Sequence, residues 1–517
     1  MTKNNIDSKK TVLIITLILF VCKVLGFLKN SVLAYYFGTG SVVDAYVMTF
    51  SIGTITSGWI AGLIGNFTPK FKQIESENNR DKALVFSSQV FNLIMVLVLS
   101  LIVILEISAP IVVKIVAPGF NTETYNYTVH FFRLYCISIL FFTVFRFSQE
   151  YLNCNQKHLS AVFPDVIMSA LCIVVIVFSH YFGADYLIWG NIIAVFLQGV
   201  ISHISTRKNG FRIRKTELWN QNLKALLLMA VPIFLSDTLA NINTLIDKIF
   251  ASNLESGIVS ALDYANTMKE FAYQVGTIAI VTIIFPVVSK YWADKNYDAF
   301  SNKILQGLDC FSVLYVPVIF GIILVGDIAI SIVFQRGEFD ETAHVITSNA
   351  FVIYSISLIA MVYRCVFLKA FYAMQKTKYI LTVSSVNVAL NILLNILLVK
   401  KLGYIGLVLS TTVAALVCMP LYFYLFKRSI QSVSYKASII KFFKCVFSSL
   451  VMAVCVYIVR LFLEDILYTD LIHKILLLAI LVVLGSAIYV VMGIIFKINE
   501  LKTILVTVKH RFIQNKG

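Results

Sequence analysis

The chain has 517 residues, of which 59% are hydrophobic and only 14% are charged, and its mean hydropathy is +0.85. Soluble domains are about 45–50% apolar and about 25% charged, so this composition excludes an ordinary soluble protein. The formal net charge of +16 would suit a nucleic-acid partner, but the placement of the charges along the chain argues against one.

Mostly apolar runs of 18 or more residues recur along the chain, and each can cross about 30 Å of hydrocarbon as a helix. We therefore predict an all-α polytopic membrane protein of about 14 transmembrane helices. The predicted spans are 11–36, 43–66, 83–107, 127–150, 158–181, 184–204, 222–250, 257–289, 304–326, 345–371, 379–399, 402–426, 442–460 and 473–496. The first run lacks a small-residue cleavage site, which favours a retained helix over a signal peptide.

Lysine and arginine alternate between the two sides of these spans. The side that carries both termini holds roughly 29 of them and the other side roughly 5, so the positive-inside rule places both termini in the cytoplasm. The basic charge is thus explained without nucleic acid. We expect a multi-pass protein of the cytoplasmic membrane.

A weak internal repeat recurs at an offset of 217 to 220 residues. The matched positions are Asp44 with Asp263, Pro69 with Pro286, Phe120 with Phe339, Gln156-Lys157 with Gln375-Lys376, and Gly183 with Gly403. Six helices per repeat keep both copies in one orientation, so the substrate path should run between two pseudo-symmetric six-helix lobes. We predict an N-lobe at 1–215, a C-lobe at 216–434 and two further helices at 435–517.

Charged residues at bilayer depth are costly and indicate functional sites. They concentrate in the leading helix pair of each lobe, and the predicted substrate-binding residues are Lys23, Lys29, Asp44, Lys269 and Glu270. Simpler roles stay open for most of them: Lys29 could snorkel to the interface, Asp44 could cap its own helix, and the last two could satisfy local partners. Asp247 and Lys248 are adjacent and point to different faces, so we expect one of them to face the cavity.

Three asparagines, Asn387, Asn391 and Asn395, form a polar stripe on the predicted helix at 379–399. Hydrogen bonding between helices explains such a stripe. The sharper hypothesis is an Na⁺ site built with Asp247 and with Thr411 or Thr412. No phosphate-binding loop is present, and we expect no cofactor. The driving force would then be Na⁺ or H⁺ coupling, the membrane potential, or consumption of the substrate outside.

Several stretches resemble the MurJ/MviN family of lipid II flippases. They are KVLGFLKNSVLAYYFGTGSVVDAYVMTF at Lys23–Phe50, VAPGF at Val116–Phe120, and ASNLESGIVSALDYANTMKEF at Ala251–Phe271 followed by FPVVSK. Lys23 and Lys29 stand where the family usually has arginines, and Asp44 matches its acidic partner. The other expected arginines fall near Ser57 and near Thr267, which has Lys269 two residues away.

The resemblance implies alternating-access transport of undecaprenyl-pyrophosphate-linked peptidoglycan precursor. It also implies a groove for the isoprenoid tail at the last two helices. The expected partners are the lipid-linked sugar, membrane lipids and the cell-wall synthesis machinery.

Three alternatives differ in the site that they require. A flippase for capsule, teichoic or O-antigen repeat units needs the same basic cavity, whereas a cation-coupled multidrug antiporter needs an acidic one. A membrane enzyme needs a long outer loop or a constellation of catalytic carboxylates, and the outer loops here are short. The sequence therefore favours a transporter and no enzymatic activity.

Overall fold

The structure is a computed structural model that describes residues 2–77, 80–217, 220–468 and 470–498. Side chains are not described at 2–13, 61, 229, 231–240, 278–286 and 465–466. The chain forms two compact units, one of residues 1–261 with 336–339 and one of residues 262–335 with 340–517. We call them unit 1 and unit 2 and describe each by itself.

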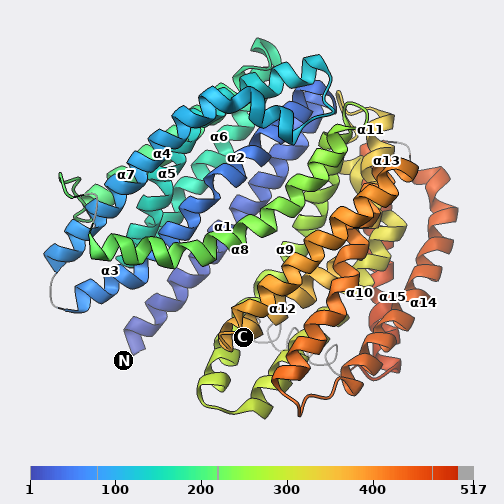
Figure 1. The fold of residues 1–517 in the computed structure, drawn as a ribbon. Coiled ribbons are helices and arrows are strands. Elements are labelled where there is room, and N and C mark those ends of the chain that lie inside the picture. The colour runs from blue at the N-terminus through green and yellow to red at the C-terminus, as the bar shows by residue number, and fades with distance from the viewer. Residues whose placement is uncertain (1, 78–79, 218–219, 469, 499–517) are drawn as a thin grey trace. The chain divides into compact units, whose positions relative to one another are not determined.

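Unit 1 consists of long helices that pack side by side (Figure 1). They are α1 (Thr2–Phe37), α2 (Ser41–Gly65), α3 (Phe67–Ser76), α4 (Arg80–Val116), α5 (Thr122–Cys154), α6 (His158–Phe182), α7 (Tyr186–Lys208), α8 (Gln221–Ser252) and the first residues of α9 (Ile258–Ala293). Helix α5 packs against α2, α4 and α7, while α1 packs on α6 and α8 packs on α2.

Unit 2 contains the rest of α9 and the helices that follow it. These are α10 (Tyr297–Val333), α11 (Glu341–Ile356), α12 (Leu358–Ala373), α13 (Thr377–Ser429), α14 (Lys436–Leu467) and α15 (Leu471–Ile495). Helix α10 packs against α11, α12, α14 and α15, so the two C-terminal helices are attached through it.

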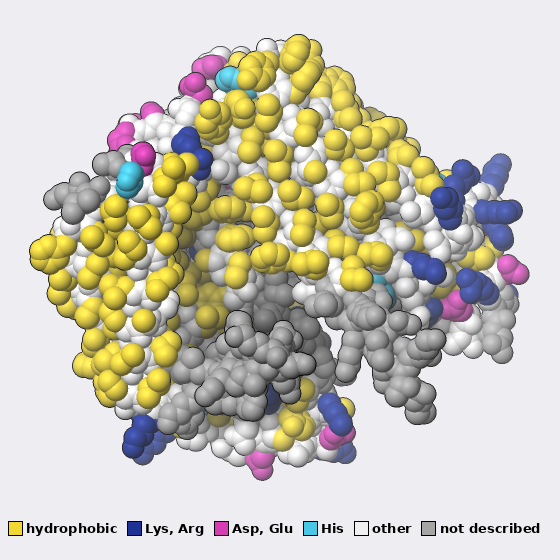
Figure 2. Space-filling model, turned by 180° about the vertical axis from the view of Figure 1, so that it is seen from behind, with side chains coloured by type: hydrophobic (Ala, Val, Ile, Leu, Met, Phe, Trp, Pro, Cys, Tyr) yellow, Lys and Arg dark blue, Asp and Glu magenta, His cyan; other side chains and the backbone are white. Residues whose placement is uncertain are grey.

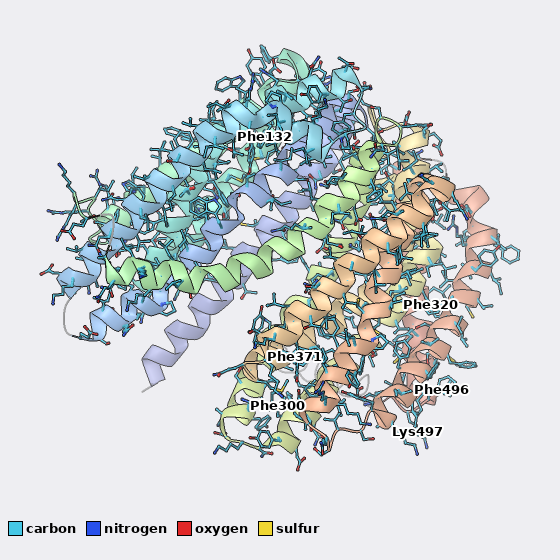
Figure 3. All side chains as sticks on the ribbon, viewed as in Figure 1. Phe132, Phe300, Phe320, Phe371, Phe496 and Lys497 are labelled. Carbon is cyan, nitrogen blue, oxygen red and sulfur yellow. The ribbon has the colours of Figure 1, made fainter. Side chains whose placement is uncertain are left out.

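Each unit has its own hydrophobic core. Phe132 belongs to the core of unit 1, and Phe300 and Phe371 belong to that of unit 2; all three are fully buried (Figure 3). Outside these cores, many large apolar side chains are exposed, including Ile107 and Phe462. Figure 2 shows such side chains spread over one face of the molecule. Surfaces of this kind suit a hydrocarbon solvent.

The described residues confirm an all-helical, multi-pass membrane fold. Ten of their helices are long and apolar enough to cross a membrane, or eleven if α11 and α12, which meet at 44°, form one broken span. Helix α13 is itself interrupted at Gly403, whose φ of 55° and ψ of −133° are not helical. The two predicted helices at 379–399 and 402–426 are therefore the two halves of α13.

Two features of the chain differ from the predicted spans. The predicted helix at 345–371 is broken between α11 and α12, at Ser357. Helix α3 was not predicted: it is short and buries Phe67, Phe71 and Ile74, which share one face. Its many polar residues placed it outside the apolar spans in the sequence, and its packing against α4 and α5 shows its amphipathic role.

Turns at matched positions of the repeat share an unusual backbone. Gln156 and Gln375 both adopt positive φ, at 60° and 57°, and the residue after each donates its amide to the carbonyl five residues earlier. Gly183 and Gly403 also have positive φ. The same turn follows α9 at Lys295 and α15 at Lys497, so it is a helix ending that this chain uses repeatedly.

Candidate functional site

Asp44 lies in the first turn of α2 and is 1% exposed. Its Oδ2 accepts a hydrogen bond from the backbone N–H of Gly257 at 2.7 Å, and its Oδ1 accepts one from the N–H of Ser260 at 2.8 Å. These two N–H groups are at the start of α9, where no carbonyl of that helix can accept them. Asp44 therefore caps α9 rather than its own helix α2.

The stretches that carry the family resemblance meet around this cap. Gly119 of the α4–α5 loop lies close to the C-terminal end of α8. A Cβ added to Gly119 would collide with the backbone of Asn253. In the same way, Gly38 after α1 approaches the backbone of Glu338, whose N–H donates to the carbonyl of Tyr35. All of these residues belong to unit 1.

This packing is reciprocal between the repeats. The loop at 117–121 contacts the end of α8, and the corresponding loop at 336–339 contacts the end of α1. Helices α1 and α8 are the first helices of the two predicted repeats. An exchange of equivalent contacts is the pattern that a two-fold relation between repeats produces.

The two predicted lysines of α1 have different surroundings. Lys29 Nζ lies 5.8 Å from the ring centre of Tyr46 and 5.7 Å from that of Phe50, both on α2. An amine over aromatic faces is attracted by their electron density. Lys23 is exposed and interacts electrostatically with Asp165 on α6.

Asp165 is the centre of a polar cluster inside unit 1. Gln198 Nε2 donates to its Oδ1 at 2.7 Å, and Gln149 Nε2 donates to its Oδ2 at 3.3 Å. Arg146 donates to Gln149 Oε1 at 2.7 Å. Sequence analysis did not single this cluster out, because its members come from three helices and share no spacing in the sequence.

Lys248 of α8 is a further basic residue whose side chain contacts α2. Its Nζ donates to Ser51 Oγ at 2.8 Å. The sequence predicted that Asp247 or Lys248 faces the cavity but could not decide between them. The bond to Ser51 turns Lys248 toward α2, and which of the two residues faces a cavity stays a prediction.

The two predicted binding residues of unit 2 lie next to each other. Lys269 is 6% exposed, with its Nζ 4.8 Å from the ring centre of Tyr354 and 4.0 Å from Glu270 Oε1. The Glu270 side chain is 37% exposed, so this is a long and half-screened ion pair. The simpler role considered for these residues, satisfying local partners, describes the contacts that the structure gives them.

The predicted cation-site residues of unit 2 form a small amide network on α13. Asn391 is fully buried; its Nδ2 donates to Thr411 Oγ1 at 3.3 Å, and its Oδ1 accepts from Asn395 at 3.1 Å. These bonds fit the role of joining the two halves of α13. Asn387 Oδ1, in contrast, is buried with no hydrogen-bond partner among the described residues. A buried amide oxygen of this kind is a ligand type that suits a cation. The remaining residue of the predicted cation site, Asp247 of α8, belongs to the other unit, unit 1.

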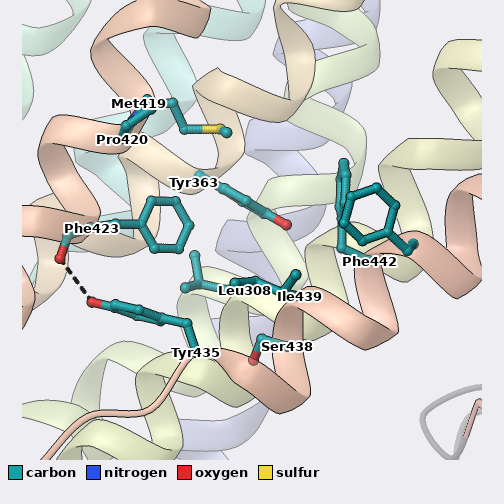
Figure 4. A pocket seen from close by; sticks show the side chains of 10 residues that line it. Leu308, Tyr363, Met419, Pro420, Phe423, Tyr435, Ser438, Ile439 and Phe442 are labelled. Carbon is teal, nitrogen blue, oxygen red and sulfur yellow. Dashed lines mark hydrogen bonds between the residues drawn. The ribbon is translucent and has the colours of Figure 1, made fainter.

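An apolar pocket of about 340 Å³ opens beside the start of α14 (Figure 4). Its wall is formed by α10, α12, α13 and α14, and Tyr435 closes one end, with its hydroxyl donating to the carbonyl of Phe423 at 2.9 Å. Ile439 and Phe443 at its rim are 52% and 64% exposed. The pocket therefore opens on an apolar surface.

A family model described as "Lipid II flippase MurJ" matches residues 33–490 of the chain. Two curated relatives carry the name "Probable lipid II flippase MurJ". The protein from Rhizobium meliloti is 26% identical over 411 residues, covering 76% of this chain and 75% of its own length. The protein from Rickettsia prowazekii is 24% identical over 490 residues, covering 92% and 95%.

Solved structures with the same fold include two transporter types. A lipid II flippase MurJ in an inward closed conformation aligns with a TM-score of 0.80 and 21% identity, covering 94% of this chain and 98% of that one. An inward-facing multidrug resistance MATE family transporter of the MOP superfamily aligns with a TM-score of 0.66 and 13% identity, covering 80% and 96%. At these identities the likeness shows the fold alone.

Proposed function

The chain belongs to the lipid II flippase MurJ family, a family of transporters and not of enzymes, and from this premise we propose that it carries lipid II across the bacterial cytoplasmic membrane. Among individual residues, the position of Lys29 carries the proposal. Its amine lies over two aromatic rings of α2, and the residue belongs to a helix segment apolar enough to cross a membrane. A basic residue kept there at a cost in free energy is suited to an anionic headgroup.

The physical task is to move a diphosphate through a low-dielectric layer. A diphosphate brings about two negative charges, and Coulomb interactions inside a protein are several-fold stronger than in water. Lysines such as Lys23 and Lys29 offset the cost of removing those charges from water. The isoprenoid tail stays in lipid throughout, so only the headgroup needs a polar path.

Movement of the headgroup is proposed to follow alternating access between an N-lobe at 1–215 and a C-lobe at 216–434. Parallel six-helix repeats are related by an axis along the membrane normal, and such lobes can rock about a site between them. The matching contacts of the loop at 117–121 with the end of α8 and of the loop at 336–339 with the end of α1 support the duplication. The proposal includes fourteen membrane spans and places both termini in the cytoplasm. This number counts α8 and α9 as one span each, the two halves of α13 as two spans, and α11 with α12 as one.

Asp44 takes a positioning role in this scheme. Its carboxylate is already bonded to two backbone N–H groups at the start of α9, so it links the second helices of the two repeats, α2 and α9, instead of pairing with a substrate cation. Lys269 and Glu270 are proposed to complete the headgroup site from the second repeat, where Lys269 keeps a buried positive charge.

The helices at 435–517 are proposed to guide the isoprenoid tail. The apolar pocket at the start of α14 supports this, because it is open at an exposed apolar rim and its lining is almost entirely hydrocarbon and aromatic (Figure 4). Pockets of about 300–1,000 Å³ are the size that small ligands occupy.

Coupling to Na⁺ or H⁺ is proposed with Asp247, Asn387, Asn391 and Thr411 as the residues concerned. The unpartnered Asn387 Oδ1 supports an Na⁺ ligand set, since Na⁺ prefers neutral and anionic oxygens. Binding of ²²Na⁺ to the purified protein tests this. Binding that survives Asp247→Ala combined with Asn387→Ala would exclude the site.

Depletion followed by lipid extraction tests the proposed substrate. We expect lipid II to accumulate on the cytoplasmic face when the protein is removed from cells that rely on it. Accumulation of a capsule, teichoic or O-antigen repeat unit instead would assign a different lipid-linked sugar. Unchanged levels of every undecaprenyl-linked species would remove the flippase function altogether.

A further inference from the structure

The segment between α7 and α8, which joins the two predicted repeats, is fastened to unit 1. We call its residues 207–215 the linker strap. Phe211 is 1% exposed, and its ring packs against those of Phe147 and Tyr151 on α5. Tyr151 also donates its hydroxyl to the carbonyl of Asn209 at 3.2 Å. Packing and hydrogen bonding therefore fix where the strap leaves α7.

Beyond Phe211 the strap runs nearly extended along α4. Ser88 Oγ donates to the carbonyl of Arg212 at 2.6 Å. Asn92 Nδ2 donates to the carbonyl of Arg214 at 2.8 Å. Four residues of helix rise about 6 Å and two residues of extended chain cover about 7 Å, so the two bonds fit a strap that is stretched out. Its backbone carbonyls are thus held on α4.

The side chains of the strap carry a concentrated positive charge. Within the part of the chain that the structure describes, none of its five basic residues forms an ion pair with a carboxylate. Ile213, between two of them, is 50% exposed. Cations around an apolar side chain suit an amphipathic anion. The five exposed basic residues are Arg207, Lys208, Arg212, Arg214 and Lys215.

The strap lies where the apolar surface of unit 1 ends. On α4, the exposed large apolar side chains begin at Val96, four residues or about 6 Å beyond Asn92. On α7, the last of them is Ile204, three residues before Arg207. Figure 2 shows basic side chains gathered beside the apolar surface. The headgroup layer of a bilayer is about 5–7 Å thick on each side, so the strap is at the height of lipid phosphates.

The second repeat has the same chain turn without the added charge. Both α7 and α13 end in a pair of basic residues, and the two pairs are 220 residues apart. After α13 comes Ile430, which is buried like Phe211, but residues 431–435 contain no basic residue. The positive-inside rule applies to both helix ends alike, so it does not account for the three basic residues that only the strap adds.

We propose that the linker strap is a binding surface for anionic phospholipids of the adjacent leaflet. Arg212 and Arg214 contact the lipid phosphates, and Ile213 contacts the top of the acyl chains. The planar guanidinium of arginine binds two phosphate oxygens at once. The inference concerns the lipids of the bilayer itself and goes beyond the proposed function, because it does not depend on which lipid-linked sugar is carried.

Fluorescence titration of the full-length protein, in a neutral detergent, with pyrene-labelled phosphatidylglycerol tests the surface. Arg212→Gln combined with Arg214→Gln should raise the Kd at least about tenfold, since each basic residue near a membrane surface contributes about fivefold. Lys427→Gln combined with Arg428→Gln is the matched control: it removes the same charge at the equivalent helix end and should leave the Kd unchanged. Raising the ionic strength from about 0.1 M to about 1 M should weaken binding by the unaltered protein, because exposed charges are screened.

Variants that keep the charge separate binding from structure. Arg212→Lys combined with Arg214→Lys should stay within about threefold of the unaltered protein. The thermal unfolding midpoint should not change in any variant, because the replaced side chains are exposed. Equal losses of affinity in the glutamine and lysine pairs, or in the strap and control pairs, would overturn the inference. So would equal affinity of the unaltered protein for pyrene-labelled phosphatidylcholine, whose headgroup has no net charge, or tighter binding of duplex DNA. The flippase proposal would stand in each of these cases, since none of them measures lipid II.

Discussion

Half-buried basic side chains of the two units contact different kinds of group. On α2 of unit 1, the amines of Lys29 and Lys248 lie against two rings and a hydroxyl. In unit 2, Arg460 of α14 binds both carboxylate oxygens of Asp327 on α10, at 2.6 and 3.0 Å, and also binds Glu464. Lys441 forms a close ion pair with Asp309 between the same two helices.

The difference lies in the kind of group that is contacted. Ion pairs with carboxylates fasten α14 to α10 and compensate charge within the protein. The rings and the hydroxyl on α2 attract an amine without bringing an opposite charge. We therefore expect the ion-paired residues of unit 2 to serve stability and Lys29 to serve the substrate.

The largest expected effect comes from breaking the α10–α14 ion pairs. Arg460→Ala leaves Asp327 and Glu464 without their cation. Loss of one partner from such a pair costs about 3 kcal/mol of stability. This value is the low end of the usual range, because both carboxylates are about one-third exposed. Thermal unfolding in nanodiscs measures this. The Kd for lipid II should be unchanged, and a weakened Kd in a protein of normal stability would contradict a purely structural role.

Removing the cap on α9 is expected to have the next largest effect. Asp44→Ala leaves two N–H groups of α9 unpaired in a buried place, at a cost of about 2 kcal/mol. We expect a lower unfolding midpoint and impaired growth when this variant is the only copy. Asp44→Asn, which keeps acceptor capacity, should recover part of both. Equal behaviour of the two variants would show that the cap is not what matters at this position.

A change at the α2 lysine should act on binding and spare the fold. Lys29→Met should raise the Kd for lipid II about tenfold, equivalent to about 1.4 kcal/mol, with little change in the unfolding midpoint. Lys23→Ala and Lys29→Ala should each impair complementation while the protein still reaches the membrane. Lys114→Met, at an exposed end of α4, is the control. Normal growth with both alanine variants would reject the headgroup assignment.

The smallest expected effect is at the cap of α5. Asn121 Oδ1 accepts from the N–H of Thr124 at 2.8 Å, so Asn121→Ala should cost about 1 kcal/mol of stability. Its Kd for lipid II should equal that of the wild type. The variant calibrates the unfolding measurement, and a larger loss than that of Arg460→Ala would reverse the ranking of the two regions.

Several predictions came from local chemistry and were met by the structure. Apolar run length predicted helices and a multi-pass fold, and the breaks near Gly183 and Gly403 were placed correctly. The role of Asp44 was open between a cap and a substrate contact. The structure shows a cap on a helix more than two hundred residues away, which no spacing within the sequence could reveal.

The sequence by itself determined that this chain is a helical membrane protein of the flippase family, because hydrophobic run length and short motifs are properties of consecutive residues. Tertiary structure alone decided which charges work together. Lys29, Ser51 and Lys248 are on three different helices, and Arg460 finds Asp327 across a gap of 133 residues. Partners of this kind depend on how helices pack and rotate against one another, and the side-chain pattern of a single helix does not carry that information.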